Sequence, residues 1–266
     1  MPRSLAFAAL SRRLITNRPL NLSREMSHPR DSLLSFNEKD HVYIFLPTGE
    51  EYISGTTFLH KFFPPFDGPK IVDKMMGSRN WDKSPYRHMT KDQILANWEL
   101  NRDTAAKAGT LMHARIESEL KGETIEWSGQ ERERDNFRAA WAELQKEGYR
   151  VYRLEWRIHT PGLAGTLDGL FINDRGEFLL LDWKRSKEIK TENRWQCLLS
   201  PLEHLPDCNY IHYSLQLNLY RWILRKHYEI DVREMRLYSF HPDQKTFLKF
   251  TIPVMEKEIQ LLLKSL

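Results

Sequence analysis

Two short apolar runs and the turn between them decide the fold: Leu163-Ala-Gly-Thr-Leu-Asp168-Gly-Leu-Phe-Ile172, then Asn173-Asp-Arg-Gly176, then Glu177-Phe-Leu-Leu-Leu-Asp182-Trp-Lys184. The turn contains Gly176, which tolerates a positive φ, so the pattern predicts a β-hairpin. The second run is continuously apolar at 178–181, which is typical of a central strand buried on both faces.

Charged side chains follow the second apolar run. Asp182 and Lys184 are two residues apart and therefore point to one face of a strand, where Asp168 can reach them from the neighbouring strand. Ionised groups are costly away from water unless they are paired or bind a metal. Two carboxylates and an ammonium at a strand end predict a site for a hard divalent cation and a phosphate ester. The hairpin alone leaves one alternative open, in which its polar residues lie at a solvated rim and have no chemical role.

The composition is that of a soluble globular protein, with 41% hydrophobic and 29% charged residues in a chain of 266. No apolar stretch approaches the ~18 residues of a membrane span, and no membrane partner is expected. Cys197 and Cys208 are the two cysteines. Two thiols exclude a four-thiolate zinc or iron–sulfur site and a disulfide framework, which makes a reducing compartment the default expectation.

The first 24 residues contain five arginines and no acidic residue. This composition is typical of an organelle transit peptide and predicts a mitochondrial location, with a nuclear or cytoplasmic protein carrying a basic tail as the alternative. The whole chain has 40 basic and 36 acidic residues, so removing these arginines leaves 35 against 36. Nucleic-acid binding therefore requires a local basic patch.

Periodicity, caps and turn residues predict the remaining elements. These are a flexible link at 25–34, a hairpin at 34–53, short helices at 56–63 and 68–81, a helix at 90–106, a second helix from a break at Gly109-Thr110 to 121, a helix at 130–147, a strand at 149–160, a long basic connection after Lys184 that includes Arg185 and Lys187, a helix at 210–226, strands at 232–240 and 246–252, and a closing helix at 253–266. Aromatic and basic residues between 43 and 87 could stack on a single nucleic-acid strand or belong to an ordinary core.

Four motifs in this order resemble the PD-(D/E)XK nuclease superfamily. They are Gly-Thr-x-x-His113 on a helix, Gly-Thr-Leu-Asp168-Gly on a strand, Asp182-Trp-Lys184 on the next strand, and Gln216-x-x-x-Tyr220 on the following helix. Within the superfamily the chain looks like the RecB-type exonuclease branch, which includes mitochondrial genome maintenance exonucleases and exonucleases of phages and large viruses. The match covers residues 105–250. Leu167 stands where the superfamily's namesake proline would be, and the RecB-type branch commonly lacks that proline.

The resemblance implies an α/β fold with a restriction-endonuclease-like core, in which helices flank a mixed central sheet. The expected organisation is a disordered basic leader at 1–30, an N-terminal hairpin and helical region at 34–100 packed on the core, and a nuclease core at 101–266. No motif of the family falls within 34–100.

The resemblance also implies roles for the site residues. Asp168 and Asp182 would bind Mg²⁺ or Mn²⁺ with the backbone carbonyl of Trp183, and Lys184 would activate the attacking water. The remaining expected contributors are His113 as a further metal ligand, Glu117 and Glu155 as supporting residues, and Gln216 and Tyr220 on the DNA backbone, with Arg185 and Lys187 from the basic connection as further DNA contacts.

The function implied is a metal-dependent deoxyribonuclease, an exonuclease on single-stranded or frayed DNA ends with a role in DNA repair. A cation held by carboxylates neutralises a phosphodiester and lowers the pKa of bound water, and a lysine stabilises charge in the transition state. Three alternatives stay open: a structure-specific endonuclease acting on DNA junctions or RNA, a nucleic-acid-binding module with a non-catalytic nuclease fold, and a structural α/β protein. The sequence leaves cleavage polarity and protein partners open.

Overall fold

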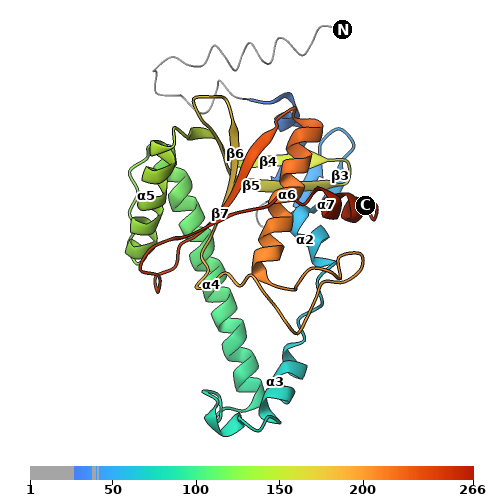
Figure 1. Cartoon of the computed structure of the whole chain (residues 1–266), viewed down its shortest axis with the longest axis vertical. Helices are drawn as coiled ribbons and strands as arrows, with labels where there is room; N and C mark the ends of the chain where they lie inside the picture. The colour runs from blue at the N-terminus through green and yellow to red at the C-terminus, as the bar shows by residue number, and fades with distance from the viewer. Residues whose placement is uncertain (1–26, 38–39, 41) are drawn as a thin grey trace.

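The chain is described by a computed structural model that covers residues 27–37, 40 and 42–266 (Figure 1). The arginine-rich segment expected to be a transit peptide lies outside these residues. Its targeting role therefore stays a prediction.

Eight strands form one mixed sheet (Figure 1). They are β1 (Leu34–Asn37), β2 (Val42–Phe45), β3 (Glu50–Ser54), β4 (Arg150–Thr160), β5 (Leu163–Ile172), β6 (Phe178–Lys184), β7 (Val232–Ser239) and β8 (Leu248–Thr251). The strand order is β1-β2-β3-β5-β6-β7-β8, with β4 paired to β5. The pairs β3–β5 and β6–β7 are parallel and the others are antiparallel. The predicted α/β class is confirmed, with a sheet of the mixed type expected for a restriction-endonuclease-like core.

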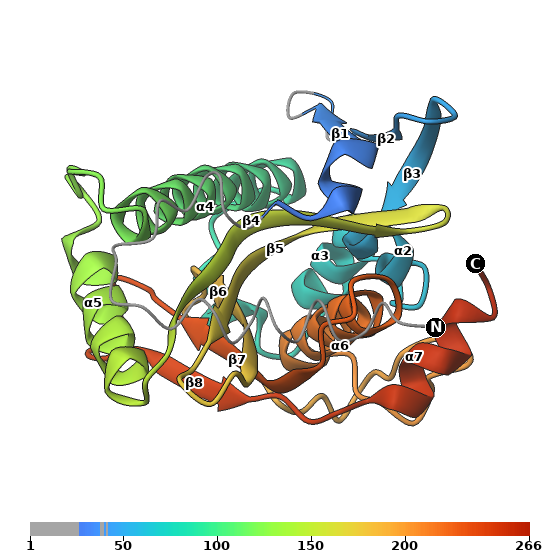
Figure 2. The same ribbon diagram turned by 90° about the horizontal axis from the view of Figure 1, so that it is seen from above.

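Helices cover both faces of the sheet, as Figure 2 shows for α4 and α6. The helical segments are η1 (Pro29–Leu33), α2 (Gly55–His60), α3 (Gly68–Met76), η2 (Trp81–Lys83), α4 (Lys91–Leu120), α5 (Glu131–Lys146), α6 (Asn209–His227) and α7 (Glu256–Leu263). The described residues form two large hydrophobic cores, the α2–α6–α7 core on one face and the α4–α5 core on the other, and a small third cluster of Leu34, Tyr43 and Ala164. Among the described residues, no helix is long and apolar enough to span a bilayer.

The central hairpin forms as predicted. β5 and β6 pair antiparallel from Gly169↔Leu181 to Ile172↔Phe178. β6 also pairs with β7, which makes it an interior strand. Its successive residues Leu179 and Leu180 are fully buried in opposite cores. The uninterrupted apolar run therefore exists because both faces of this strand are covered by helices.

The predicted break at Gly109-Thr110 is wrong. α4 runs through this point without interruption, and the Thr110 hydroxyl donates to the carbonyl of Ala106 at 3.1 Å. One glycine costs a helix only about 1 kcal/mol. The fully buried Met112 and Ile116 hold the second half of the helix against the sheet and outweigh that cost. Thr90 caps the helix as predicted, since its side chain accepts from the N–H of Gln93.

The ends of the chain differ from expectation in three further places. Residues 34–53 form three strands instead of two, because β2 pairs with both β1 and β3. The closing helix begins at Glu256, three residues after Pro253. The segment expected to be a flexible link contains η1, which is tied to β4: Arg30 donates to Nδ1 and to the carbonyl of His159, both at 2.9 Å.

Replacing Gly165 by alanine should destabilise the fold by about 1–3 kcal/mol, the usual cost of overpacking a core. A Cβ atom on Gly165 would lie 2.5 Å from Cε1 of Tyr220, which is buried in α6. Urea unfolding measures the effect. Gly109→Ala is the control, because no atom lies within 4 Å of its added Cβ and alanine favours the helix by up to about 1 kcal/mol. Equal stability of the two variants would contradict the expected clash.

Candidate metal centre

The candidate site lies where β6 separates from β5. β5 pairs with β3 at Leu163 and Ala164, and with β6 from Gly169 onward. Beyond Leu181, β6 continues beside β7 alone. The backbone N–H of Trp183 therefore donates to Oδ2 of Asp168 at 2.9 Å. The divergence of β5 and β6 thus places the buried carboxylate of Asp168 where the backbone hydrogen bonds between these strands end.

Three side chains from three elements meet at this point: His113 of α4, Glu155 of β4 and Asp168 of β5. They form a candidate metal-binding group, called the metal cluster below. One ligand atom of each lies within 4.8 Å of the others. His113 Nδ1 is 3.7 Å from Oδ1 of Asp168 and 3.8 Å from Oε1 of Glu155, distances too long for hydrogen bonds. Oε1 of Glu155 is buried without a hydrogen-bond partner among the described residues. An imidazole and two carboxylates at these distances from one another fit a divalent cation.

Asp182 and Lys184 form an ion pair beside the metal cluster. Lys184 Nζ donates to Oδ1 of Asp182 at 2.8 Å, which confirms that the two side chains share a face. The ammonium also lies 5.2 Å from the ring centre of Tyr213 on α6. Asp182, expected to be a primary metal ligand, falls outside the group of three. Its Oδ2 is buried and has no hydrogen-bond partner among the described residues, so this oxygen is available to a ligand.

Burial and mutual charge shift the pKa values of four groups of the site, which are Asp168, Asp182, His113 and Lys184. Burial raises the pKa of Asp182 to about 6 against the opposing charge of Lys184, and it raises the pKa of Asp168 as well. Burial lowers the pKa of His113, but Asp168 and Glu155 outweigh that effect, so the pKa is raised overall. The pKa of Lys184 is raised because Asp182 and Asp168 outweigh its burial. The site therefore favours added positive charge, which a divalent cation would supply.

Three expected site residues lie elsewhere or make other contacts. Glu117 points along α4 to Lys121, whose Nζ is 2.5 Å from its carboxylate. Tyr220 is 3% exposed and packs against Gly165, which leaves almost none of its surface for the expected DNA contact. Gln216 is half-buried and hydrogen-bonds Tyr220, a contact that opposes the burial-raised pKa of the phenol. The role of the Trp183 carbonyl stays a prediction.

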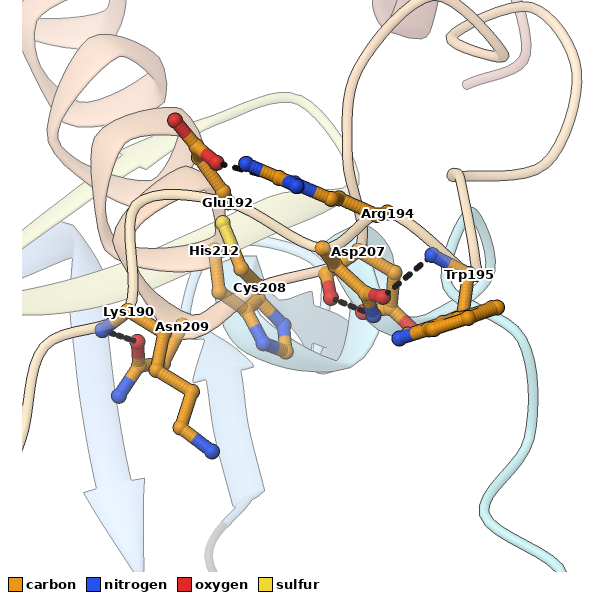
Figure 3. Close-up of a pocket in the computed structure, with 9 residues that line it drawn as sticks. Lys190, Glu192, Arg194, Trp195, Asp207, Cys208, Asn209 and His212 are labelled. Atoms are coloured by element: carbon orange, nitrogen blue, oxygen red, sulfur yellow. Dashed lines mark hydrogen bonds and ion pairs between the residues drawn. The ribbon is translucent and has the colours of Figure 1, made fainter.

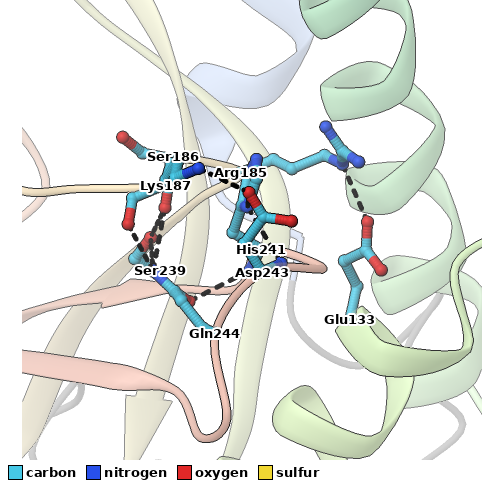
Figure 4. Close-up of polar contacts among 8 residues, drawn as sticks. All are labelled: Glu133, Arg185, Ser186, Lys187, Ser239, His241, Asp243 and Gln244. Carbon is cyan, nitrogen blue, oxygen red and sulfur yellow. Dashed lines mark hydrogen bonds and ion pairs between the residues drawn. The ribbon is translucent and has the colours of Figure 1, made fainter.

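Arg185 and Lys187, expected to contact DNA, are both paired (Figure 4). Arg185 Nε donates to Oε1 of Glu133 at 2.9 Å, and Glu133 is 1% exposed. This pair fastens the end of β6 to α5. The DNA contact expected of Arg185 stays a prediction. Lys187 Nζ lies 2.8 Å from Asp243 in an exposed ion pair, while Gln244 donates to the carbonyl of Ser186. An exposed pair is weak, so Lys187 can exchange Asp243 for a phosphate.

An open pocket of about 720 Å³ lies beside the N-terminus of α6 (Figure 3). Its lining includes Lys190, Arg194, Asp207, His212 and Trp195, which is 96% exposed. A second pocket of about 770 Å³ shares Asp207 and His212 with the first and adds residues around Phe63, Phe66 and Lys70.

His212 lines both pockets. Its ring stacks on Phe63 with 3.8 Å between centroids, and burial lowers its pKa to about 4. The next residue along α6, Tyr213, contacts Lys184. The charge of Lys184 also lowers the pKa of His212, so the electrostatic influence of the candidate site extends to a side chain that lines both pockets.

Glu155 was expected to support the site from outside the ligand set, but it is a member of the metal cluster. Glu155 has a φ of +44°, a left-handed conformation that is rare for residues other than glycine. In sequence, the signal was a carboxylate within a predicted strand, which by itself does not distinguish a ligand from a solvated side chain.

No family model matches the chain, and no curated protein matches it. Among solved structures, the chain is similar to the one titled "Crystal structure of SSO0001", with 17% sequence identity, coverage of 81% of this chain and 74% of that chain, and a TM-score of 0.32. A likeness this weak identifies neither a family nor an activity. The protein has a mixed α/β sheet in which β5 and β6 carry the buried Asp168 and Asp182, and β4 carries the partly exposed Glu155, beside one histidine and one lysine.

Proposed function

We propose that the protein is a Mg²⁺- or Mn²⁺-dependent nuclease that hydrolyses DNA phosphodiester bonds, acting as an exonuclease on single-stranded or frayed ends. The observation that supports this proposal is the metal cluster with the Asp182–Lys184 pair beside it. Exonuclease rather than endonuclease cleavage, and a role in DNA repair, rest on the resemblance of the sequence motifs alone.

His113, Glu155 and Asp168 would hold the cation, and Asp182 offers its free Oδ2. When bound, the cation would neutralise the phosphodiester and lower the pKa of a water molecule. The donor set fits this role because carboxylate and imidazole groups suit Mn²⁺, and carboxylates suit Mg²⁺.

Lys184 would supply the second positive charge. Asp182 orients the ammonium through the 2.8 Å hydrogen bond, and the ring of Tyr213 lies on another side of it. An ammonium held in this way can donate a hydrogen bond to a phosphate oxygen or to the attacking water. It acts without reorganisation during the reaction, because its partners are already in place.

The two pockets beside His212 would hold the single strand. The exposed indole of Trp195 can stack on a base, and Lys190 and Arg194 can neutralise phosphates. A duplex would have to fray to enter a site in which Asp168 and Asp182 are buried.

The decisive experiment incubates the protein with end-labelled linear single-stranded DNA, duplex DNA, circular single-stranded DNA and RNA, in Mg²⁺, in Mn²⁺ and in EDTA. Shortening of linear DNA with intact circles is expected. Cleaved circles would favour an endonuclease, cleaved RNA would change the substrate class, and binding without cleavage in either metal would identify a non-catalytic module.

His113→Ala should weaken Mn²⁺ activation of cleavage by about tenfold or more, because an imidazole of the metal cluster is lost. The measurement is the Mn²⁺ concentration for half-maximal cleavage. Glu117→Ala is the matched control, one helical turn further along α4 and paired with Lys121. Equal effects of the two substitutions would return His113 to a structural role.

We also propose a mitochondrial location. Residues 1–30 fused to a fluorescent reporter should direct it to the mitochondrion in the source cell. A diffuse reporter would contradict this targeting.

A further inference from the structure

The side chains of β4 exchange faces of the sheet at Glu155. Leu154 packs against the α4–α5 core, whereas Trp156 is buried in the α2–α6–α7 core. Residues two apart on a regular strand point to the same face. The left-handed φ of Glu155, +44°, lies between these residues and accounts for the reversal. The same irregularity lets the Glu155 carboxylate reach His113 on α4.

Asp31 in η1 holds the chain on both sides of this irregularity. Its Oδ2 accepts from Nη2 of Arg153 at 2.8 Å, and its Oδ1 accepts from Nε1 of Trp156 at 2.7 Å. Residues three apart on a regular strand point to opposite faces, so one carboxylate could not bind both. Here the Arg153 guanidinium lies over the Trp156 ring, 4.4 Å from its centroid.

The carboxylate of Asp31 is itself fixed. The backbone N–H of His28 donates to Oδ2 of Asp31 at 2.9 Å, which closes a capping box around η1. The next contact along, from Arg30 to His159, fastens the segment further along β4. Asp31 is half-buried, as is Arg153, so the pair is partly shielded from solvent.

We infer that Asp31 is a positioning residue for the metal centre: by bonding Arg153 and Trp156, it stabilises the left-handed turn at Glu155 that directs this carboxylate to His113 and Asp168. This inference rests on the proposed metal centre. Left-handed backbone at a residue other than glycine persists where its surroundings hold it, and two hydrogen bonds to flanking side chains provide such a restraint. The N-terminal segment is thereby part of the site, although no atom of it lies in the metal cluster.

The test measures Mn²⁺ affinity by calorimetry on the full chain without DNA. Asp31→Ala should weaken binding by about tenfold, the usual lower effect of losing an outer partner of a metal ligand. Asp174→Ala is the matched control, because Asp174 also binds an arginine of β4, Arg150, at 2.9 Å, at the far end of the strand. This control should bind Mn²⁺ like the unmodified chain.

A double substitution separates positioning from general stability. Glu155→Gln should weaken Mn²⁺ binding by itself, and adding Asp31→Ala to it should cause no further loss. Trp156→Phe keeps an aromatic ring in the core and removes one of the two hydrogen bonds, so a smaller loss of affinity is expected even if Asp31→Ala does not fold.

Three outcomes would overturn the inference. Unchanged affinity in Asp31→Ala and Trp156→Phe, with weakened affinity in Glu155→Gln, would show that Asp31 does not act on the site. Additive losses in the double variant would show that it acts elsewhere. No Mn²⁺ binding by the unmodified chain would overturn the metal centre itself, whereas normal Mn²⁺ behaviour without DNA cleavage would overturn only the proposed nuclease activity.

Discussion

Asp168→Asn is expected to abolish DNA cleavage and Mn²⁺ binding together. Asp168 faces the metal cluster and is bonded to the strand that carries the charged pair: Oδ1 lies 3.7 Å from Nδ1 of His113, and Oδ2 accepts from the backbone N–H of Trp183 at 2.9 Å. Asparagine keeps the shape of the side chain but removes a negative charge from a buried cluster. We expect the cleavage rate to fall by about a thousandfold, the upper range for removing one preorganised electrostatic group.

Single-turnover cleavage of end-labelled single-stranded DNA measures this loss, with calorimetry for Mn²⁺. Asp243→Asn is the matched control, because it removes the same charge from an exposed aspartate, which pairs with Lys187. It should leave both quantities unchanged. Full activity in Asp168→Asn would show that the chemistry occurs elsewhere in the molecule.

The hairpin and its charged residues could be predicted from sequence because they are encoded locally. The apolar run 178–181, the turn at 173–176 and the Asp182-Trp-Lys184 ending all lie within one stretch. The alternation of a strand is enough to place Asp182 and Lys184 on one face. The helix carrying His113 was also predicted, although its length was not, because burial of Met112 and Ile116 outweighs a glycine.

The full metal cluster could not be predicted, because it depends on contacts between distant segments. Glu155 itself has a left-handed backbone conformation within a strand, and this conformation directs its side chain to His113. The local preferences of a glutamate argue against that conformation. Asp31 and Trp156, which are joined by a hydrogen bond next to Glu155, are separated by 125 positions. A regular strand pattern gives no indication of such a contact.

Residues of α6 show a second limit of prediction from sequence. The spacing of Gln216 and Tyr220 correctly places them on one face of a helix, but spacing does not say what that face contacts. Gly165 and Gly55 lack side chains where the Tyr220 ring packs, and this close approach buries the tyrosine. Sequence reasoning identified the pair and assigned it to DNA, whereas the structure has Tyr220 supporting β5.

Lys184→Ala should slow the chemical step by about a hundredfold or more, because a positive charge is lost where negative charge develops in the transition state. DNA affinity should change little, since the ammonium is mostly buried and already bonded to Asp182 at 2.8 Å. Asp182 will lose its partner and its pKa, already about 6, should rise further. Thermal unfolding is therefore measured alongside, because removing one member of a buried pair costs about 3–5 kcal/mol.

Lys187→Ala provides the matched control for this substitution. Both lysines bond an aspartate at 2.8 Å, but Lys187 is 73% exposed and Lys184 is 20% exposed. If Lys187 contacts DNA, its loss should weaken binding and spare the single-turnover rate at saturating DNA, the reverse of the pattern for Lys184. Lys184→Arg keeps the charge and should retain more activity than alanine if its side chain fits beside Tyr213. A folded Lys184→Ala variant with a normal saturating rate and weakened DNA binding would make Lys184 a binding residue, and the charge-stabilising role proposed for it would be wrong.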